Sequence, residues 1–174
     1  MGIFSITIAL FFAYVFMFSA VTKIKGLSDH VKIFTSYEIL PHQFSIPFSL
    51  GFIAIEVISS LLIIFRFHAV IGIIMLGILT FIYTLAILIN LLRGRKDLSC
   101  GCGGVLGDHN ISYKLISRNI LIISGLFLVY LLPSGEILLV PYVLLNILVI
   151  SGFCLYLIVI EMQTIKRLRK ELLA

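Results

Sequence analysis

Long apolar runs dominate this 174-residue chain, and each is about long enough to cross a membrane as a helix. Such a helix needs about 20 mostly apolar residues, because it rises only about 1.5 Å per residue. The chain is 61% hydrophobic and 12% charged, whereas soluble domains are about 45–50% apolar and about 25% charged. The excess apolar surface must face lipid. The runs predict spans at about residues 2–21, 44–65, 69–92, 114–132 and 137–160.

We therefore expect an all-α membrane protein with the lipid bilayer as a partner, in which about five transmembrane helices form a bundle over residues 1–160. The first run carries Ser5, Ala9 and Ala13 at every fourth position. Such a stripe of small residues lets another helix approach closely. Residues 66–68 are the only polar break between the second and third runs, which predicts a tight helical hairpin.

The polar segment 23–43 predicts a short helix that lies at the membrane surface. Ser28 and Asp29 are of the residue types that cap helices, and Pro41 is expected to end the helix. The apolar face of this helix would comprise Val31, Phe34 and Tyr37, with Asp29, Lys32 and Ser36 pointing away.

Basic side chains cluster between the apolar runs, a pattern of membrane proteins and not of nucleic-acid binders. With five spans, residues 23–43, 93–117 and 161–174 share one side of the membrane. That side holds twelve of the 13 Lys and Arg residues, with Arg118 counted at its boundary, and the other side holds Arg66. The positive-inside rule then predicts a multi-pass protein of the cell membrane with its N-terminus outside and its C-terminus in the cytoplasm. The tail 161–174 is basic and amphipathic, and we expect it to lie on an anionic leaflet.

One loop carries a distinctive pair of thiols, Cys100 and Cys102, separated only by Gly101. Cα atoms two residues apart lie roughly 5.5–7 Å from each other in extended or turn backbone, which overlaps the disulfide range of about 4.4–6.8 Å. Gly101 has no Cβ to hinder so small a ring. A disulfide under such strain is easily reduced, so the pair suits exchange better than a permanent cross-link. Basic residues at 93–96 favour the thiolate.

Two other interpretations of the pair stay open. Two thiolates with His109 or Asp108 are suitable ligands for a soft metal such as Zn(II) or Cu(I), although we predict no resident metal and no cofactor. Alternatively, the cysteines are small residues in a glycine-rich turn. Cys154, in the fifth span, is either a third thiol of the site or a small packing residue.

Glu56 lies near the middle of the second span, where a carboxyl group is costly and marks a functional candidate by default. The polar side chains expected within its reach are Tyr83, Asn90, Asn119 and Asn146. Such a contact would either fix helix packing or handle protons. Lys23, at the end of the first span, is expected to extend to the lipid headgroups and anchor the helix.

Several motifs resemble, in their order, those of MauE- and DoxX-like membrane proteins. They are Thr22-Lys23-Ile24-Lys25-Gly26, Tyr37-Glu38-Ile39-Leu40-Pro41, Glu56, the Asn90–Arg95 segment, Cys100-Gly101-Cys102-Gly103-Gly104, Ile111-Ser112 and Arg118-Asn119. The resemblance covers roughly residues 1–135, and the Cys-Gly-Cys segment is its most specific part. Gly103-Gly104 departs from it, because the family more often has a phenylalanine followed by glycine. This loosens the local packing that would be transferred but leaves both thiols.

The resemblance implies a MauE-type protein with a four-helix DoxX-like core, an additional span and an association with thiol redox chemistry. Its motif positions are Lys23, Tyr37, Pro41, Gly101, Arg118 and Asn119. The name-giving members are required for methylamine utilisation. They are thought to help mature a disulfide-rich small subunit of methylamine dehydrogenase beside a thioredoxin-like partner.

The resulting hypothesis is a membrane thiol-redox protein, a thiol–disulfide oxidoreductase, whose Cys100 and Cys102 exchange disulfides with a thioredoxin-like partner and a protein substrate. The rival hypothesis is a non-enzymatic accessory or transport component, whose loop binds a soft metal or is only structural. Maturing a secreted protein needs thiols outside the cell, whereas the charges place them inside. A loop that dips into the bundle would reconcile the two, provided that protein or water covers its backbone.

Overall fold

The computed structural model describes residues 2–38, 41–95, 97–99, 110–132 and 138–173. The chain divides into two compact units, Met1–Gly135 and Glu136–Ala174. The helices in the described residues are α1 (Gly2–Lys25), α2 (Leu27–Ser36), α3 (His42–Ile64), α4 (Ala69–Leu92), α5 (Tyr113–Leu131) and α6 (Leu139–Leu173). Five of them contain stretches long and apolar enough to cross a membrane: Gly2–Lys25, Gln43–Ile64, Ala69–Leu92, Tyr113–Leu131 and Leu139–Val159. The prediction of a helical membrane bundle with five spans is confirmed.

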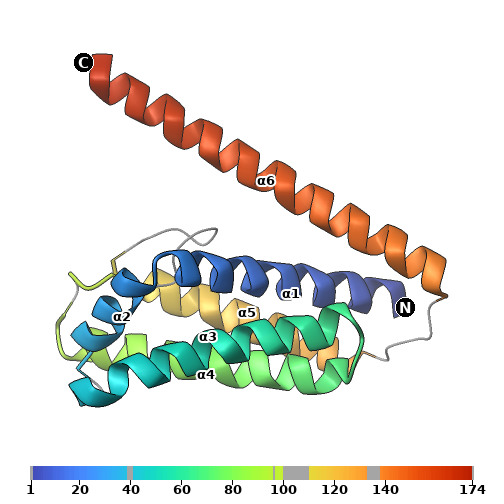
Figure 1. Ribbon diagram of the computed structural model, residues 1–174, viewed down its shortest axis with the longest axis horizontal. Coiled ribbons are helices and arrows are strands. Elements are labelled where there is room, and N and C mark those ends of the chain that lie inside the picture. The colour runs from blue at the N-terminus through green and yellow to red at the C-terminus, as the bar shows by residue number, and fades with distance from the viewer. Residues whose placement is uncertain (1, 39–40, 96, 100–109, 133–137, 174) are drawn as a thin grey trace. The chain divides into compact units, whose positions relative to one another are not determined.

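The first unit contains a bundle of four long helices (Figure 1). α1 packs against α3 and α5, and α4 packs against the same two helices. The short helix α2 lies on α3 and follows α1 almost without a break. Because α1 and α4 end where α3 and α5 begin, α2 and the segment after α4 meet at one end of the bundle.

Small residues allow the helices of this bundle to pack closely. The stripe of Ser5, Ala9 and Ala13 on α1 is buried. Gly125 of α5 lies so close to the ring of Phe12 that a Cβ there would be 2.7 Å from it. Gly72 of α4 has the same relation to α3, since a Cβ would lie 2.7 Å from the backbone oxygen of Ser59. These contacts explain how the bundle packs in lipid, where hydrophobic driving force between helices is small.

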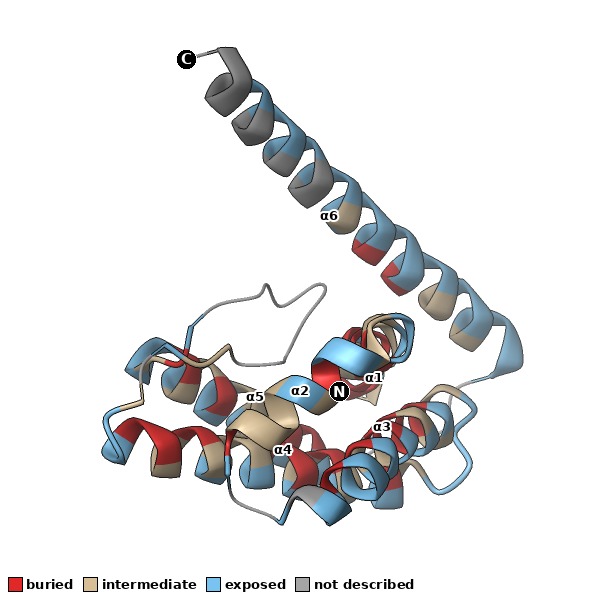
Figure 2. Cartoon of the chain, turned by 60° about the vertical axis from the view of Figure 1, so that its left-hand side comes forward, coloured by how far each residue is buried: buried red, intermediate tan, exposed pale blue. Residues whose placement is uncertain are grey.

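Large apolar side chains occupy both the inside and the outside of the bundle. The inner cluster comprises Ala9, Ala13, Phe16, Ile63, Ile73, Leu76, Leu126 and Val129. The outer faces of α3 and α4 carry exposed apolar residues such as Phe48, Ile58 and Phe81, and Figure 2 shows these helices buried on one face only. An apolar exterior of this kind fits a lipid environment.

The predicted hairpin turn is present between Ile64 and Ala69. Arg66 and His68 adopt positive φ angles of 57° and 52° there, a left-handed conformation that is uncommon outside glycine. The predicted capping of the surface helix is wrong. α2 begins at Leu27, and its N-cap residue is Gly26, which forms no side-chain cap. The amide of Gly26 instead donates to the carbonyl of Thr22 at the end of α1.

The second unit consists of α6, which runs as one helix from Leu139 to Leu173. The fifth span and the basic tail are therefore parts of a single continuous helix. The division of the chain falls after Gly135, and the single bundle over residues 1–160 stays a prediction. α6 continues through residue 160 because no glycine or proline interrupts the helix there.

Candidate functional site: a buried polar cluster and a tethered loop

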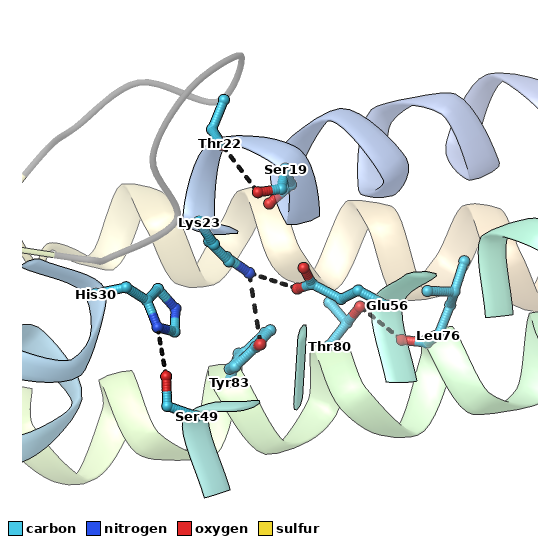
Figure 3. Close-up of polar contacts among 9 residues, drawn as sticks. All are labelled: Ser19, Thr22, Lys23, His30, Ser49, Glu56, Leu76, Thr80 and Tyr83. Atoms are coloured by element: carbon cyan, nitrogen blue, oxygen red, sulfur yellow. Dashed lines mark hydrogen bonds and ion pairs between the residues drawn. The ribbon is translucent and has the colours of Figure 1, made fainter. Parts of the chain in front are cut away.

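Three polar side chains from three helices meet inside the bundle (Figure 3). The ammonium group of Lys23 on α1 forms an ion pair with Oε1 of Glu56 on α3. The same nitrogen lies 3.5 Å from the hydroxyl of Tyr83 on α4 and 4.8 Å from the centre of its ring. The side chains of Lys23 and Glu56 are only 4% and 1% exposed. We call these three residues the polar cluster.

Burial explains why the two charges in the polar cluster must be close. Removing an isolated charge from water costs several kcal/mol even after the protein relaxes, and only a close counter-charge offsets that cost. Lys23 supplies the counter-charge for Glu56, and the face of the Tyr83 ring adds a cation–π contact. The second carboxylate oxygen of Glu56 has no hydrogen-bond partner among the described residues.

Two sequence-based expectations about these residues need correction. Lys23 does not extend to the headgroups, because its ammonium group points into the bundle and pairs with Glu56. Lys23 was also missing from the expected partners of Glu56, of which Tyr83 does join the cluster. Asn90 and Asn146 instead donate to carbonyls one turn back in their own helices, at 3.0 and 2.9 Å.

A second buried contact, between His30 on α2 and Ser49 on α3, lies beside the polar cluster (Figure 3). His30 Nδ1 is 2.8 Å from the Ser49 hydroxyl. Burial, assisted by the positive charge of Lys23, lowers the pKa of His30 to about 4. The imidazole is therefore neutral at physiological pH. Sequence reasoning did not single out His30, although His30 shares a helical face with Phe34 and Tyr37.

The inner face of α3 is polar along most of its length. It buries Ser45, Ser49, Glu56, Ser59 and Ser60. The ring of Phe52 interrupts this series, with its centroid 5.7 Å from those of both Phe34 and Tyr83. Aromatic packing thus separates the His30–Ser49 contact from the polar cluster.

At the end of the bundle, the residues after α4 are fastened to the end of α2. Arg95 forms an ion pair with the carboxylate of Glu38 and donates to the carbonyl of Ser36 at 3.3 Å. Arg93 donates to the carbonyl of Glu38 at 3.4 Å. The hydrogen bond and positive charge of Arg95 lower the pKa of Glu38. These contacts join segments that are far apart in the sequence.

The same end holds the base of the loop that carries the cysteine pair. The hydroxyl of Tyr37 donates to the carbonyl of Ser99 at 3.2 Å, and that carbonyl belongs to the peptide bond that leads into Cys100. Ser99 pairs with Asn110 in an isolated antiparallel bridge, and the amide of Ile111 donates to the carbonyl of Leu98 at 2.9 Å.

Residues at the loop base pack in an apolar cluster. It comprises Tyr37, Ile87, Leu91, Ile111 and Leu115. Burial in this cluster raises the pKa of Tyr37 to about 12, so its hydroxyl stays a hydrogen-bond donor at all physiological pH values. We call the contacts of Tyr37, Glu38, Arg93 and Arg95 to their partners the loop tether.

Other predicted site residues fall in different places. Cys100, Gly101 and Cys102, with the candidate ligands Asp108 and His109, lie outside the described residues. Cys154 is a free thiol on α6, in the second unit, so its prediction as a third thiol stays untested. Pro41 precedes the first residue of α3. Arg118 and Asn119 lie in the second turn of α5, where Asn119 is buried.

No group of three or more His, Cys, Asp or Glu side chains within the described ranges is arranged to hold a metal ion. The soft-metal interpretation of the cysteine loop is not tested by this observation, because its proposed ligands are not among those residues.

Comparison with known proteins identifies the family. Residues 1–132 match the sequence model of a family described as methylamine utilisation protein MauE. The chain belongs to the MauE family. The MauE match covers the four-helix bundle, α2, the polar cluster and the loop tether, and it ends before α6. It confirms the resemblance drawn from the motifs. Searches of curated proteins and of solved structures gave no match.

Proposed function

We propose that this MauE-family protein is a membrane thiol–disulfide exchange protein whose Cys100 and Cys102 act on a partner protein. The observation that carries the proposal is the loop tether. Tyr37 holds the carbonyl that leads into Cys100, and the bridge between Ser99 and Asn110 closes the base of the loop. A thiol pair that reacts repeatedly with another protein benefits from a fixed entry and exit of its loop, because productive attack needs close and aligned sulfur atoms.

The exchange is a pair of substitutions at sulfur. The thiolate of one cysteine attacks a disulfide in the partner, which forms a mixed disulfide and expels one partner thiolate. The other cysteine then attacks the mixed disulfide and releases the second thiolate. The Cys-Gly-Cys pair ends as a disulfide, and the partner disulfide has accepted two electrons and becomes a dithiol. The reverse sequence oxidises the partner.

Basic residues favour this chemistry. Arg93 and Arg95 lie within the tether that begins the loop, and nearby positive charge stabilises a thiolate. Arg95 is partly neutralised by Glu38, so Arg93 has more of its charge available. The family's description supports methylamine utilisation as the biological setting. In that setting the partners would be a thioredoxin-like protein and a protein that needs its disulfides matured.

The basic residues also support an orientation with the N-terminus outside and the C-terminus in the cytoplasm. Lys23 no longer counts as a loop charge, because it is buried in the polar cluster. Of the other twelve Lys and Arg residues, eleven belong to the side that holds the cysteine loop and only Arg66 to the opposite side. The bias therefore survives the correction. In this orientation the end of the bundle that holds the loop base would face the cytoplasm.

Trapping tests the chemistry. In a Cys154→Ser background, Cys102→Ser leaves Cys100 unable to resolve a mixed disulfide, and Cys100→Ser is the matched control. We expect one of the two variants to accumulate a covalent adduct that reductant releases, and the double variant to accumulate none. The adduct is then identified by mass spectrometry. Thiol labelling that never depends on prior reduction, in wild type and variants alike, would contradict the proposal. A metal that copurifies only while both cysteines are present would favour the metal-binding alternative.

Topology needs a separate measurement. A membrane-impermeant thiol reagent is applied to intact cells and to inverted vesicles of the Cys154→Ser protein, after reduction. We expect labelling of Cys100 and Cys102 in inverted vesicles only. Labelling only in intact cells would reverse the orientation while leaving the exchange chemistry standing.

A further inference from the structure

The end of α2 takes a backbone conformation that its residue type disfavours. Glu38 follows the last turn of α2 with a φ angle of 48°, and its amide still donates to the carbonyl of Thr35 at 3.1 Å. Many helices end with a left-handed residue of this kind, and that residue is usually glycine, because a side chain makes the conformation costly. A glutamate at this place therefore points to a use for its carboxylate.

The end of α4, which meets the end of α2 at the same end of the bundle, has the usual arrangement. Gly94 has a φ angle of 77°, and its amide donates to the carbonyl of Leu91 at 3.0 Å. The amide of Arg95 donates to the carbonyl of Asn90 at 3.1 Å. This is the Schellman motif, with glycine in the left-handed position, and it fixes the backbone of Arg95 directly after α4. The left-handed residue is thus glycine after α4 but glutamate after α2.

The carboxylate of Glu38 holds the segment that leads to the cysteine loop. It forms an ion pair with Arg95, whose guanidinium also donates to the carbonyl of Ser36 at 3.3 Å. The carbonyl of Glu38 accepts from Arg93 at 3.4 Å. The side chain of Glu38 is 62% exposed, so the ion pair adds little to folding stability. Its effect is geometric, because it holds the start of the segment 95–99 against the end of α2.

The residue before Glu38 holds the other end of the same segment. The hydroxyl of Tyr37 donates to the carbonyl of Ser99, which directly precedes Cys100. Two consecutive residues at the end of α2 therefore contact the segment 95–99 at both of its ends. A glycine in place of Glu38 would end α2 equally well but would leave the first of these two contacts unmade.

We propose that Glu38 is a positioning residue for the cysteine loop, a role that rests on the proposed exchange function. It takes the place of a capping glycine at the end of α2 and, through Arg95, fixes where the chain enters the loop. The restraint returns the entry to Cys100 to the same place in each round of exchange, which favours aligned attack by sulfur. Glu38 acts through Arg95 and not on the sulfur atoms, so it affects the rate of exchange and not its chemistry.

Replacement of Glu38 by glycine separates this role from a role in ending the helix. Glycine adopts the left-handed conformation without steric cost, so Glu38→Gly should unfold at an unchanged or higher denaturant concentration. The variant lacks the ion pair, however, and should slow exchange at the cysteine pair by about two- to fivefold, the range that an exposed pair can supply. Exchange is measured in a Cys154→Ser background with the neutral reagent 2-hydroxyethyl disulfide, so that the charge of the reagent has no effect.

Further variants show whether the effect belongs to this contact. Arg95→Gln should slow exchange as much as Glu38→Gly does, and the double variant should be no slower than either single variant, because both changes remove the same contact. Asp29→Asn is the matched control. It removes the carboxylate of another exposed ion pair of α2, the one with Lys32, and should leave the exchange rate unchanged.

Three results would overturn the proposal. A wild-type exchange rate in Glu38→Gly would show that the carboxylate has no part in positioning the loop. Slower exchange together with a lower unfolding midpoint would show that Glu38 serves only to end the helix. Equal slowing by Asp29→Asn would show a general effect of surface charge.

Hydrogen exchange at the amide of Ile111 gives a second readout that does not depend on the thiols. This amide donates to the carbonyl of Leu98 at the loop base, and it should exchange faster in Glu38→Gly than in wild type. If wild type exchanged no disulfide, the proposed function would fail, and this amide alone would decide whether Glu38 positions the loop. Unchanged protection of the amide would then overturn the inference.

Discussion

Two ion pairs in the described part of the bundle each join a glutamate to a basic residue distant in the sequence, and they differ mainly in exposure. The buried pair joins Lys23 and Glu56, whose side chains are 4% and 1% exposed. The tether pair joins Arg95 and Glu38, whose side chains are 37% and 62% exposed. In both pairs, the direct contact joins segments that are far apart in the sequence.

The difference teaches that similar chemistry serves different purposes in the two places. Water solvates each partner of the exposed pair, so the pair adds little energy and mainly restricts where the loop base can lie. Lipid and protein offer no such solvation to Lys23 and Glu56, so each is strongly dependent on the other. The buried pair therefore fixes how α1 and α3 face each other, whereas the tether pair fixes a surface segment.

The largest expected effect comes from removing one partner of the buried pair. Glu56→Leu leaves the ammonium group of Lys23 buried without its counter-charge and should destabilise the bundle by about 3–5 kcal/mol. The double variant Lys23→Met/Glu56→Leu removes both charges and should recover most of the loss. The measurement is denaturant-induced unfolding in detergent micelles, followed by circular dichroism. A double variant no more stable than the single one would show that shape, and not charge, holds the site together.

The next largest expected effect is a loss of folding stability in acid, caused by His30. Its pKa is about 4 in the folded protein and 6.5 in the reference state, so the unfolded chain binds a proton first as the pH falls. The stability that neutral His30 contributes is present above pH 6.5 and is lost as the pH falls toward 4. The loss is about 3 kcal/mol, since each unit of pKa corresponds to about 1.4 kcal/mol. Unfolding free energies of wild type and His30→Gln, measured across this range, should diverge; parallel curves would contradict the assignment.

The contribution of close helix packing to stability can be measured separately from that of the buried polar contacts. Gly72→Ala puts a methyl group 2.7 Å from the backbone oxygen of Ser59, and overpacking of this kind costs about 1–3 kcal/mol. Gly77→Ala, on the same helix, has nothing within 4 Å of the new Cβ and should be neutral or slightly stabilising. The same unfolding assay compares them. Equal effects would mean that the α3–α4 contact yields easily and does not position the polar cluster.

The sequence was sufficient for the spans because membrane thickness imposes one length on every crossing helix. It also placed the hairpin at Arg66–His68, where polar residues interrupt the apolar run. Periodicity correctly put Asp29 and Lys32 on the exposed face of α2. These features depend on local composition, because the bilayer requires spanning segments of a certain length and apolarity.

The polar cluster could not be predicted in the same way, because its geometry depends on how α1 and α3 are rotated and staggered. Lys23 is two residues from the end of α1, which locally looks like a headgroup anchor. A rule that a buried acid needs a buried base would have suggested Lys23. His30 was missed for a related reason, since only the facing Ser49 identifies it as a buried polar contact.

Removal of one hydroxyl from the loop tether should have a smaller energetic effect but a functional one. Tyr37→Phe keeps the buried ring and deletes the hydrogen bond to the Ser99 carbonyl, at a cost of about 1 kcal/mol. We expect slower thiol–disulfide exchange at the cysteine pair, because the backbone that enters Cys100 loses a fixed contact. Exchange rates with a small disulfide reagent provide the measurement. Tyr83→Phe, which deletes a hydroxyl away from the loop, is the matched control and should leave the rate unchanged.

The smallest expected effect on stability belongs to the exposed pair, and its dependence on salt makes it informative. Arg95→Gln and Glu38→Gln should each leave the unfolding midpoint almost unchanged, because water replaces the lost partner. A double-mutant cycle should give a coupling that is detectable at low ionic strength and vanishes at high ionic strength. The cycle for Lys23 and Glu56 should keep its coupling in high salt, since ions do not reach the buried pair. If both couplings responded equally to salt, the polar cluster would have to be open to water, and the contrast between the two pairs would fail.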